Sequence, residues 1–320
     1  MAAERRTQSR KAGSQNGPAV AAREPRPTHV STLPVPLLTD ATPAAQGFVI
    51  IAAPLVQAAL HYATALESQA HPENLHKLRI SLRRLRSLIW AYEPLLDQSI
   101  AEVWREQFKG IADAAGRTRD WDILLDTLIP ASRLKRQEQA TLADSGRRLR
   151  GEALEQSREA VRRADLRVLL AGAEQLAQAQ LAASHVDIDT AKFAQLRIER
   201  AARTVRRRAR QAVKAGTRDL SALHRARIAI KKLRYLLEFF EPLCVLHRKA
   251  ARRHAKRLAK LQTKLGNLND LVVGAQLAQT HLYGQVDEQK SARKLDADLR
   301  KTLRRQAKSA RKGLRRYLKS

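Results

Sequence analysis

The 320-residue chain is poor in cysteine, aromatic residues and long apolar runs. A single cysteine, Cys244, excludes a disulfide framework within the chain and favours a reducing compartment, the cytoplasm. It lies in an apolar run, so we expect a small buried side chain without a function of its own. No stretch approaches the 18 or more apolar residues of a membrane span. A transmembrane protein is therefore not expected.

Acidic residues are also scarce relative to basic ones. The chain holds 61 Lys and Arg against 31 Asp and Glu, which gives a formal net charge of +30 and a pI near 11.2. Such an excess repels itself, so the protein is predicted to have an anionic partner. A hydrophobic content of 44% is ample for a packed core. We therefore expect a folded protein that binds an anion.

Residues 1–45 differ from the remainder of the chain in composition. They contain six of the 11 prolines and few large apolar residues, which is typical of a disordered tail. From residue 46 to 320, apolar residues recur at three- and four-residue steps, and this pattern predicts helix throughout. Breaks between helices are predicted at His71-Pro72, Glu93-Pro94, Gly116, Pro130, 184–190, Gly216, Glu241-Pro242, Gly266 and Gly284.

An internal repeat is the most informative feature of the sequence. The segment 76–95 (HKLRISLRRLRSLIWAYEPL) matches the segment 224–243 (HRARIAIKKLRYLLEFFEPL) at nine of 20 positions. A second matched pair follows, a glycine and then an aspartate four residues later, at Gly116 and Asp120 and at Gly266 and Asp270. Order and spacing are both kept. The repeat predicts two helical bundles, at about 46–183 and 190–320, related by a pseudo-twofold axis.

Each copy of the repeat carries a stripe of basic residues headed by a histidine. On a helix that advances 100° per residue, the four members of the first stripe fall within an arc of roughly 80°. The first stripe consists of His76, Arg79, Arg83 and Arg86, and the second of His224, Arg227, Lys231 and Arg234; Arg84 and Lys232 match each other on another side.

Neither 76–90 nor 224–237 contains an acid. A helix stabilised by surface ion pairs would place Glu or Asp three or four residues from its cations. Clustering unpaired cations costs self-repulsion, which a bound anion with many oxygens would relieve. One such stripe alone would indicate an ordinary solvated face. Its duplication together with the histidine favours a binding site for a polyanion.

The two histidine-headed basic helices and the two Gly-to-Asp segments resemble the CHAD domain over about residues 46–320. The resemblance implies an all-α fold of two antiparallel four-helix bundles around a basic central cavity. It also implies binding of inorganic polyphosphate without hydrolysis, and therefore a protein that is not an enzyme. Carried over by position, the ligand-facing residues are His76, Arg79, Arg83, Arg84, Arg86, His224, Arg227, Lys231, Lys232 and Arg234. Arg117 and Arg119 stand where the second copy has Asn267 and Asn269, so the halves are expected to contribute unequally.

Further cations recur at helical spacing outside the stripes. Each set is either an extension of the binding surface or ordinary solvated surface. One set lies on the helix before His224 and the other precedes Gly266 in the sequence: Arg203, Arg207, Arg210 and Lys214, and Lys256, Lys260 and Lys264.

Other chemistries find little support in the sequence. Asp120, Asp122 and Asp126 suggest a divalent metal site, but only Asp120 has a counterpart, Asp270, so helix capping or pairing with arginines is the better interpretation. Neither a metal nor a cofactor is expected. The alternative function is sequence-nonspecific binding of nucleic-acid backbones, with nucleic acid as a competitor for the same cations. We expect a cytoplasmic protein associated with polyphosphate granules.

Overall fold

The computed structural model describes residues 38–68, 71–183, 188–216, 219–243, 248–282 and 286–319. Over these ranges the chain is helical, with one isolated β-bridge between Pro43 and Asp189. Most of the expected N-terminal tail lies outside the described residues, as do Cys244 and Gly284. Leu38 is already buried, so the packed part of the chain begins before the boundary expected at residue 46.

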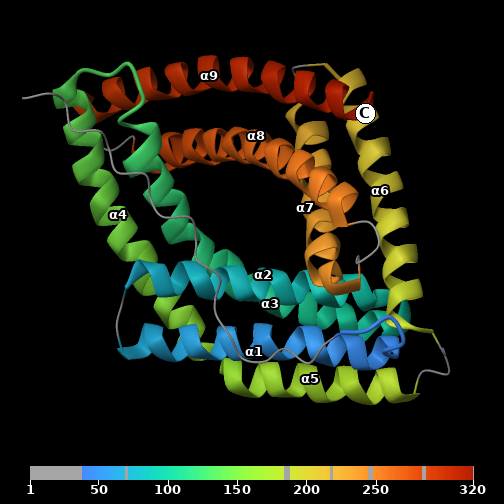
Figure 1. Ribbon diagram of the computed structural model, residues 1–320. Coiled ribbons are helices and arrows are strands. Elements are labelled where there is room, and N and C mark those ends of the chain that lie inside the picture. Colours follow the sequence, from blue (N-terminus) through green and yellow to red (C-terminus); the bar gives the residue numbers. More distant parts are fainter. Residues whose placement is uncertain are drawn as a thin grey trace, which may run out of the picture. The chain divides into compact units, whose positions relative to one another are not determined.

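Two similar series of helices follow one another along the chain (Figure 1). In each series, two helices precede a 3₁₀ turn of sequence Glu-Pro-Leu, and two longer helices follow it. The first series is α1 (Ala44–Ser68), α2 (Pro72–Tyr92), the turn Glu93–Leu95, α3 (Gln98–Ile123), a π-helical turn (Leu124–Leu128) and α4 (Arg136–Arg163), after which comes α5 (Leu166–Ala183). The second is α6 (Thr190–Lys214), α7 (Leu220–Phe239), the turn Glu241–Leu243, α8 (Arg248–His281) and α9 (Val286–Leu318).

Most of the breaks predicted from the sequence are confirmed. His71 caps α2 by accepting a hydrogen bond from the Glu73 amide, and Gly216, with φ of +80°, follows the end of α6. The breaks predicted at Gly116 and Gly266 are wrong, because both glycines lie inside long helices, where packing offsets a cost of about 1 kcal/mol for one glycine. The sequence did not indicate the break between α4 and α5, where Asp165 adopts φ of +37°.

The hydrophobic core joins the two series of helices instead of separating them. α2 packs against α7, α3 against α8, and α4 against α9. The larger core cluster includes Leu78 of α2 and Ile230 of α7, both fully buried. A smaller cluster joins Leu124, in the π-helical turn after α3, to Leu295 of α9. Equivalent helices of the repeat are therefore held against one another by shared cores.

α1 is the one helix among the described residues that is long and apolar enough to cross a membrane, by length and composition. Core helices meet the same criteria. α1 packs against α2 and α5, and Phe48, Val56 and Leu66 on its length are buried. We therefore assign α1 to the core of the bundle.

The starts of α1 and α6 meet at an antiparallel backbone bridge. The Thr190 amide and its hydroxyl both donate hydrogen bonds to the Thr42 carbonyl oxygen, at 2.7 and 2.6 Å. The two threonines are 148 residues apart, the same offset as the histidines that head the basic stripes. The repeat therefore includes this junction as well as the basic helices.

Replacing Gly47 with alanine is expected to destabilise the protein by roughly 1–3 kcal/mol. A Cβ atom at Gly47 would lie 2.5 Å from the Thr190 hydroxyl oxygen, which is fixed by its hydrogen bond to Thr42. Urea unfolding measures the loss. Gly151→Ala is the matched control, because nothing lies within 4 Å of a Cβ at this helical position. The control should gain about 0.5–1 kcal/mol, and an equal gain at Gly47 would contradict close packing at this junction.

Candidate functional site

The first basic stripe lies along α2 at the edge of the core. Leu78, Leu82 and Leu85 are buried on one face, and the histidine and arginines beside them are half-buried. Half-buried cations normally find acceptors, because an unsatisfied buried polar atom costs free energy. Among the described residues, four nitrogen atoms of this helix are buried without a hydrogen-bond partner: His76 Nδ1 and the Nε atoms of Arg83, Arg84 and Arg86.

The second stripe lies along α7 and differs in detail. Arg227 and Lys231 are half-buried, whereas His224 is exposed. Arg234 donates a hydrogen bond of 2.6 Å to the Glu238 carboxylate, so part of its charge is already neutralised. The second stripe therefore offers its strongest unmet charge at Arg227 and Lys231.

Contact between α2 and α7 places the two stripes in one basic cluster, which we define as Arg79, Arg83, Arg86, Arg227 and Lys231. Lys231 lies at its centre. Burial, and after it the charges of the nearby arginines, lower the pKa of Lys231 to about 7; Arg83 has the largest effect of the four, followed by Arg227, Arg86 and Arg79. The shift reflects burial first and the surrounding positive charge second.

The two aspartates of the repeat lie beside this cluster. Burial raises the pKa of Asp120 and of Asp270, and the charge of Asp270 raises the pKa of Asp120 further. The charge of Arg79 opposes this rise most strongly at Asp120, and that of Arg227 does so at Asp270. Pairing with arginines is thus supported, whereas capping is wrong because both residues are inside helices. Each half contributes one arginine and one facing acid.

Gly116 and Asp122 show how α3 accommodates its arginines. A Cβ atom at Gly116 would lie 3.4 Å from three atoms of the Arg79 guanidinium, so the glycine allows Arg79 to approach the helix closely. No atom lies so near Gly266, its counterpart in α8. The Asp122 carboxylate lies 2.8 Å from Arg150 of α4, and this ion pair joins α3 to α4.

The two histidines lie in unequal surroundings. Burial lowers the pKa of His76, and the next largest effect is the positive charge of Arg119. The counterpart of Arg119 is Asn269, which lines a pocket of about 210 Å³ beside His224 and Arg227. The exchange of arginine for asparagine therefore leaves the two histidines in different electrostatic surroundings.

Arg84 and Lys232, which match each other in the repeat, form reciprocal contacts between α2 and α7. The Arg84 guanidinium lies 6.0 Å from the centre of the Phe239 ring, and Lys232 Nζ lies 4.4 Å from the centre of the Trp90 ring. Cation–π contacts of this kind are worth about 0.5–2 kcal/mol. Both side chains therefore also hold the two helices together.

The two additional sets of cations lie on other surfaces. On α6, Arg203 is exposed and 3.8 Å from Glu199. On α8, Lys260 and Lys264 line a pocket of about 350 Å³ with residues of α9. All seven residues are exposed: Arg203, Arg207, Arg210, Lys214, Lys256, Lys260 and Lys264.

A family model for the CHAD domain matches residues 50–279, more than two thirds of the chain. The chain belongs to the CHAD domain family. The CHAD domain from the plant Ricinus communis, known from a crystal structure, is 23% identical with a TM-score of 0.76 and covers 88% of this chain and 94% of its own. PptA from Streptomyces chartreusis is 16% identical with a TM-score of 0.58 and covers 87% and 100%. Identities this low show the fold alone. Comparison with curated proteins found no match.

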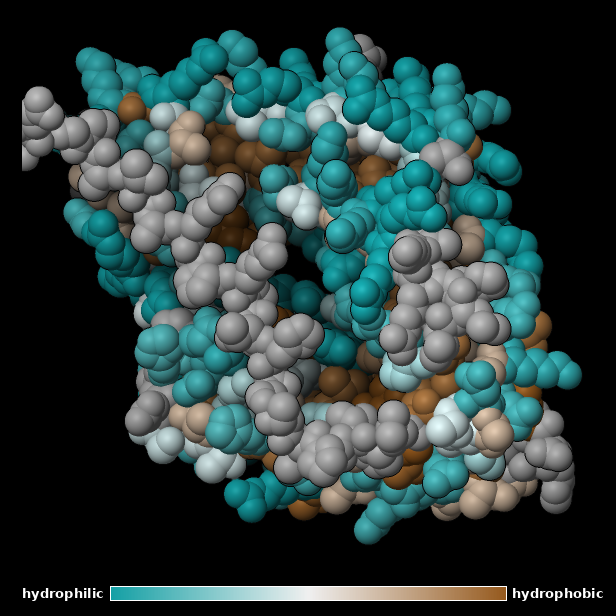
Figure 2. All heavy atoms as spheres, in the orientation of Figure 1, coloured by the Kyte–Doolittle hydropathy of each residue, from teal (hydrophilic) through white to brown (hydrophobic). Residues whose placement is uncertain are grey.

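This CHAD domain has a hollow in the face shown in Figure 2, between α2, α7 and α8, and the residues around it are mostly hydrophilic. The basic cluster belongs to two of these helices. Among the described side chains, no group of three or more His, Cys, Asp or Glu residues is arranged to hold a metal ion.

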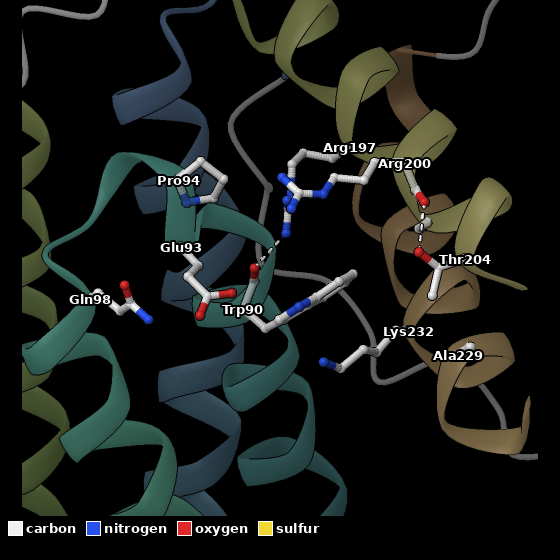
Figure 3. Close-up of a pocket in the computed structure, with 10 residues that line it drawn as sticks. Trp90, Glu93, Pro94, Gln98, Arg197, Arg200, Thr204, Ala229 and Lys232 are labelled. Atoms are coloured by element: carbon white, nitrogen blue, oxygen red, sulfur yellow. Dashed lines mark hydrogen bonds between the residues drawn. The ribbon is translucent and has the colours of Figure 1, made fainter. Parts of the chain in front are cut away.

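A separate pocket of about 530 Å³ was not foreseen from the sequence, apart from one member, Lys232. Its most notable residue is Arg197 of α6, which is only 7% exposed. Figure 3 shows Arg197 and Lys232 near Trp90, with Glu93 and Gln98 across the pocket. A signal was available in the sequence, because Arg197 interrupts the apolar series Phe193, Ala201, Val205 and Ala209 at four-residue steps.

Proposed function

We propose that this CHAD domain binds inorganic polyphosphate, without hydrolysing it, at the basic cluster between α2 and α7. The observation that carries the proposal is Lys231, a half-buried lysine whose pKa is lowered to about 7 beside four arginines. The arrangement is unfavourable for the protein alone and becomes favourable when a polyanion supplies the missing negative charge. A linear phosphate chain suits cations spaced at single helical turns along two adjacent helices.

The repeat supports an architecture of two four-helix bundles related by a pseudo-twofold axis, with the bound chain in the hollow between them. α1 to α4 pack in succession and α4 also contacts α1, and α6 to α9 are arranged in the same way. In this arrangement each bundle supplies one basic stripe and one aspartate to the site. We further propose a cytoplasmic protein that associates with polyphosphate granules through this site.

Nucleic-acid binding is the alternative, and the aromatic residues argue against it. Proteins that bind single strands usually stack bases on exposed rings. Here Tyr92, Phe239 and Phe240 are at most 5% exposed, and cations lie over the Trp90 ring. The site is therefore better suited to a chain of phosphates without bases.

Calorimetric titration with long-chain polyphosphate at physiological salt tests the proposal, with duplex DNA and single-stranded RNA as parallel ligands. Saturable binding to polyphosphate that persists in excess duplex DNA is expected. Binding to either nucleic acid that is equal or stronger would replace the proposal with a generic phosphate-backbone function.

The double substitution Arg83→Ala and Arg227→Ala is expected to weaken polyphosphate binding by about a hundredfold or more, because each charge-assisted contact is worth about 1.5–3 kcal/mol. It should also flatten the salt dependence of the affinity. The matched control is Arg203→Ala with Arg207→Ala, which removes the same charge from exposed positions of α6. Affinity should change far less in the control. An equal loss in both variants would place binding on the net charge of the protein and not on the cluster.

A further inference from the structure

The pocket around Trp90 begins where the basic cluster ends. Arg86 and Trp90 are four residues apart on α2, and side chains with this spacing are neighbours on one helix face. On α7, Lys232 of the pocket directly follows Lys231 of the cluster. The two sites therefore adjoin along α2, whereas the side chains of Lys231 and Lys232 leave α7 about 100° apart.

Cations dominate the lining of this pocket. Arg197, Arg200 and Lys232 line it together with one acid, Glu93, whose carboxylate accepts a hydrogen bond of 2.8 Å from Arg105. Glu93 is therefore already paired with an arginine that does not line the pocket. The pocket keeps an excess of positive charge, as the cluster does.

Arg197 has an obvious structural role that does not account for all of its donors. Its Nη2 atom donates a hydrogen bond of 2.8 Å to the Trp90 carbonyl oxygen, and its guanidinium lies 4.9 Å from the centre of the Trp90 ring. Its Nε atom is buried and has no partner among the described residues. Arg197 is almost fully buried and also borders a cavity of about 530 Å³, which is large enough for a ligand.

Electrostatic coupling between pocket and cluster agrees with this geometry. Burial lowers the pKa of Lys232 most, and the charge of Arg105 is the next largest cause. Glu93 opposes this shift, and Arg197 from the pocket and Arg86 from the cluster lower the pKa further. Lys232 therefore lies within the field of cations from both the pocket and the cluster.

We propose that this pocket is a second phosphate-binding segment, which receives the part of a polyphosphate chain that extends beyond Arg86. This inference rests on the proposed function. A chain of a few phosphates would fill the cluster alone, whereas a long chain would occupy both sites. The pocket would thereby give the protein a preference for long chains.

Trp90 reports directly on the pocket once the other two tryptophans, Trp104 and Trp121, are replaced with phenylalanine. Long-chain polyphosphate is expected to change the fluorescence of Trp90, and tripolyphosphate is expected to leave it nearly unchanged at saturation. Equal changes with both ligands would overturn the idea of an extended track. Calorimetry on the same protein establishes that each ligand is bound.

Arg197→Gln should weaken binding of long-chain polyphosphate about tenfold and leave the affinity for tripolyphosphate unchanged. Glutamine keeps a donor for the Trp90 carbonyl, and circular dichroism checks the fold. Arg200→Gln, at an exposed position of the same pocket, is a second variant with the same expected pattern. Arg203→Gln on the exposed face of α6 is the control. Unchanged long-chain affinity in both pocket variants would refute the second segment and leave the proposed function intact, whereas absence of polyphosphate binding in the unmodified protein would refute the proposed function itself.

Discussion

Replacing Lys231 with methionine is expected to weaken polyphosphate binding at least tenfold and to raise the melting temperature of the ligand-free protein. The loss of affinity follows from removing the central cation of the cluster. The gain in stability follows from the pKa of Lys231, which is about 7 in the folded protein and 10.5 for an unperturbed lysine. A protonated Lys231 therefore opposes folding, and methionine fills similar space without charge.

The sign of the stability effect can be checked against pH. The unfolded state binds more protons than the folded state between pH 7 and 10.5, so this group makes the unmodified protein more stable as pH rises through that range. The advantage of the Lys231→Met variant should be full below pH 7 and disappear toward pH 10.5. Calorimetric melting curves recorded over this pH range measure the stability of the unmodified protein and of the variant. Lys301→Met, at an exposed position of α9, is the control. A lower melting temperature in the Lys231→Met variant would show that Lys231 is satisfied by the protein itself.

Polyphosphate affinity is expected to fall by up to about tenfold for each pH unit above 7. Phosphate oxygens favour the protonated form of Lys231, so binding raises its pKa from about 7 and takes up a proton. The contribution of this lysine to affinity is full below pH 7 and is lost as pH rises from there to the pKa of the complex. The internal phosphates of a long chain stay ionised throughout this range.

Calorimetry at pH 8 in buffers of different ionisation enthalpy counts the protons taken up. Uptake approaching one proton is expected for the unmodified protein, and nearly none for the Lys231→Met variant. His76 adds a second window below its ordinary pKa of 6.5, because burial and Arg119 lower its pKa in the free protein and a bound phosphate raises it. The His76→Ala variant should lose this second window alone. Affinity independent of pH from 7 to 9 would contradict the central position of Lys231.

Features that depend on a few neighbouring residues, such as helix starts and turns, were predicted well from the sequence. The helix that contains His76 begins at Pro72, because proline suits the first turn of a helix. The Glu-Pro-Leu segments became 3₁₀ turns after both basic helices. Glycine was a weaker guide, since Gly216 ends a helix with positive φ whereas Gly116 lies inside α3 beneath Arg79. The composition around each glycine did not distinguish the two cases, which depend on what packs against the helix.

The position of Arg197 illustrates a different limit. Its charge made it look like one more cation of a basic helix, and only its place in the apolar series of α6 marked it as buried. That it meets Trp90, which is 107 residues away in sequence, could not be inferred from either segment alone. The cations counted as additional candidates, such as Arg203 and Lys260, are exposed instead.

Periodicity, charge and repetition were sufficient to establish a helical protein with two basic stripes, because these properties depend on spacing along one helix. The contact between α2 and α7 was decided by the tertiary structure, because it depends on buried leucines of both halves that share one core. That contact makes Lys231 the centre of a cluster and gives Arg197 a pocket. Burial shifts the pKa of a charged side chain, and these side chains become buried only when helices distant in sequence pack together.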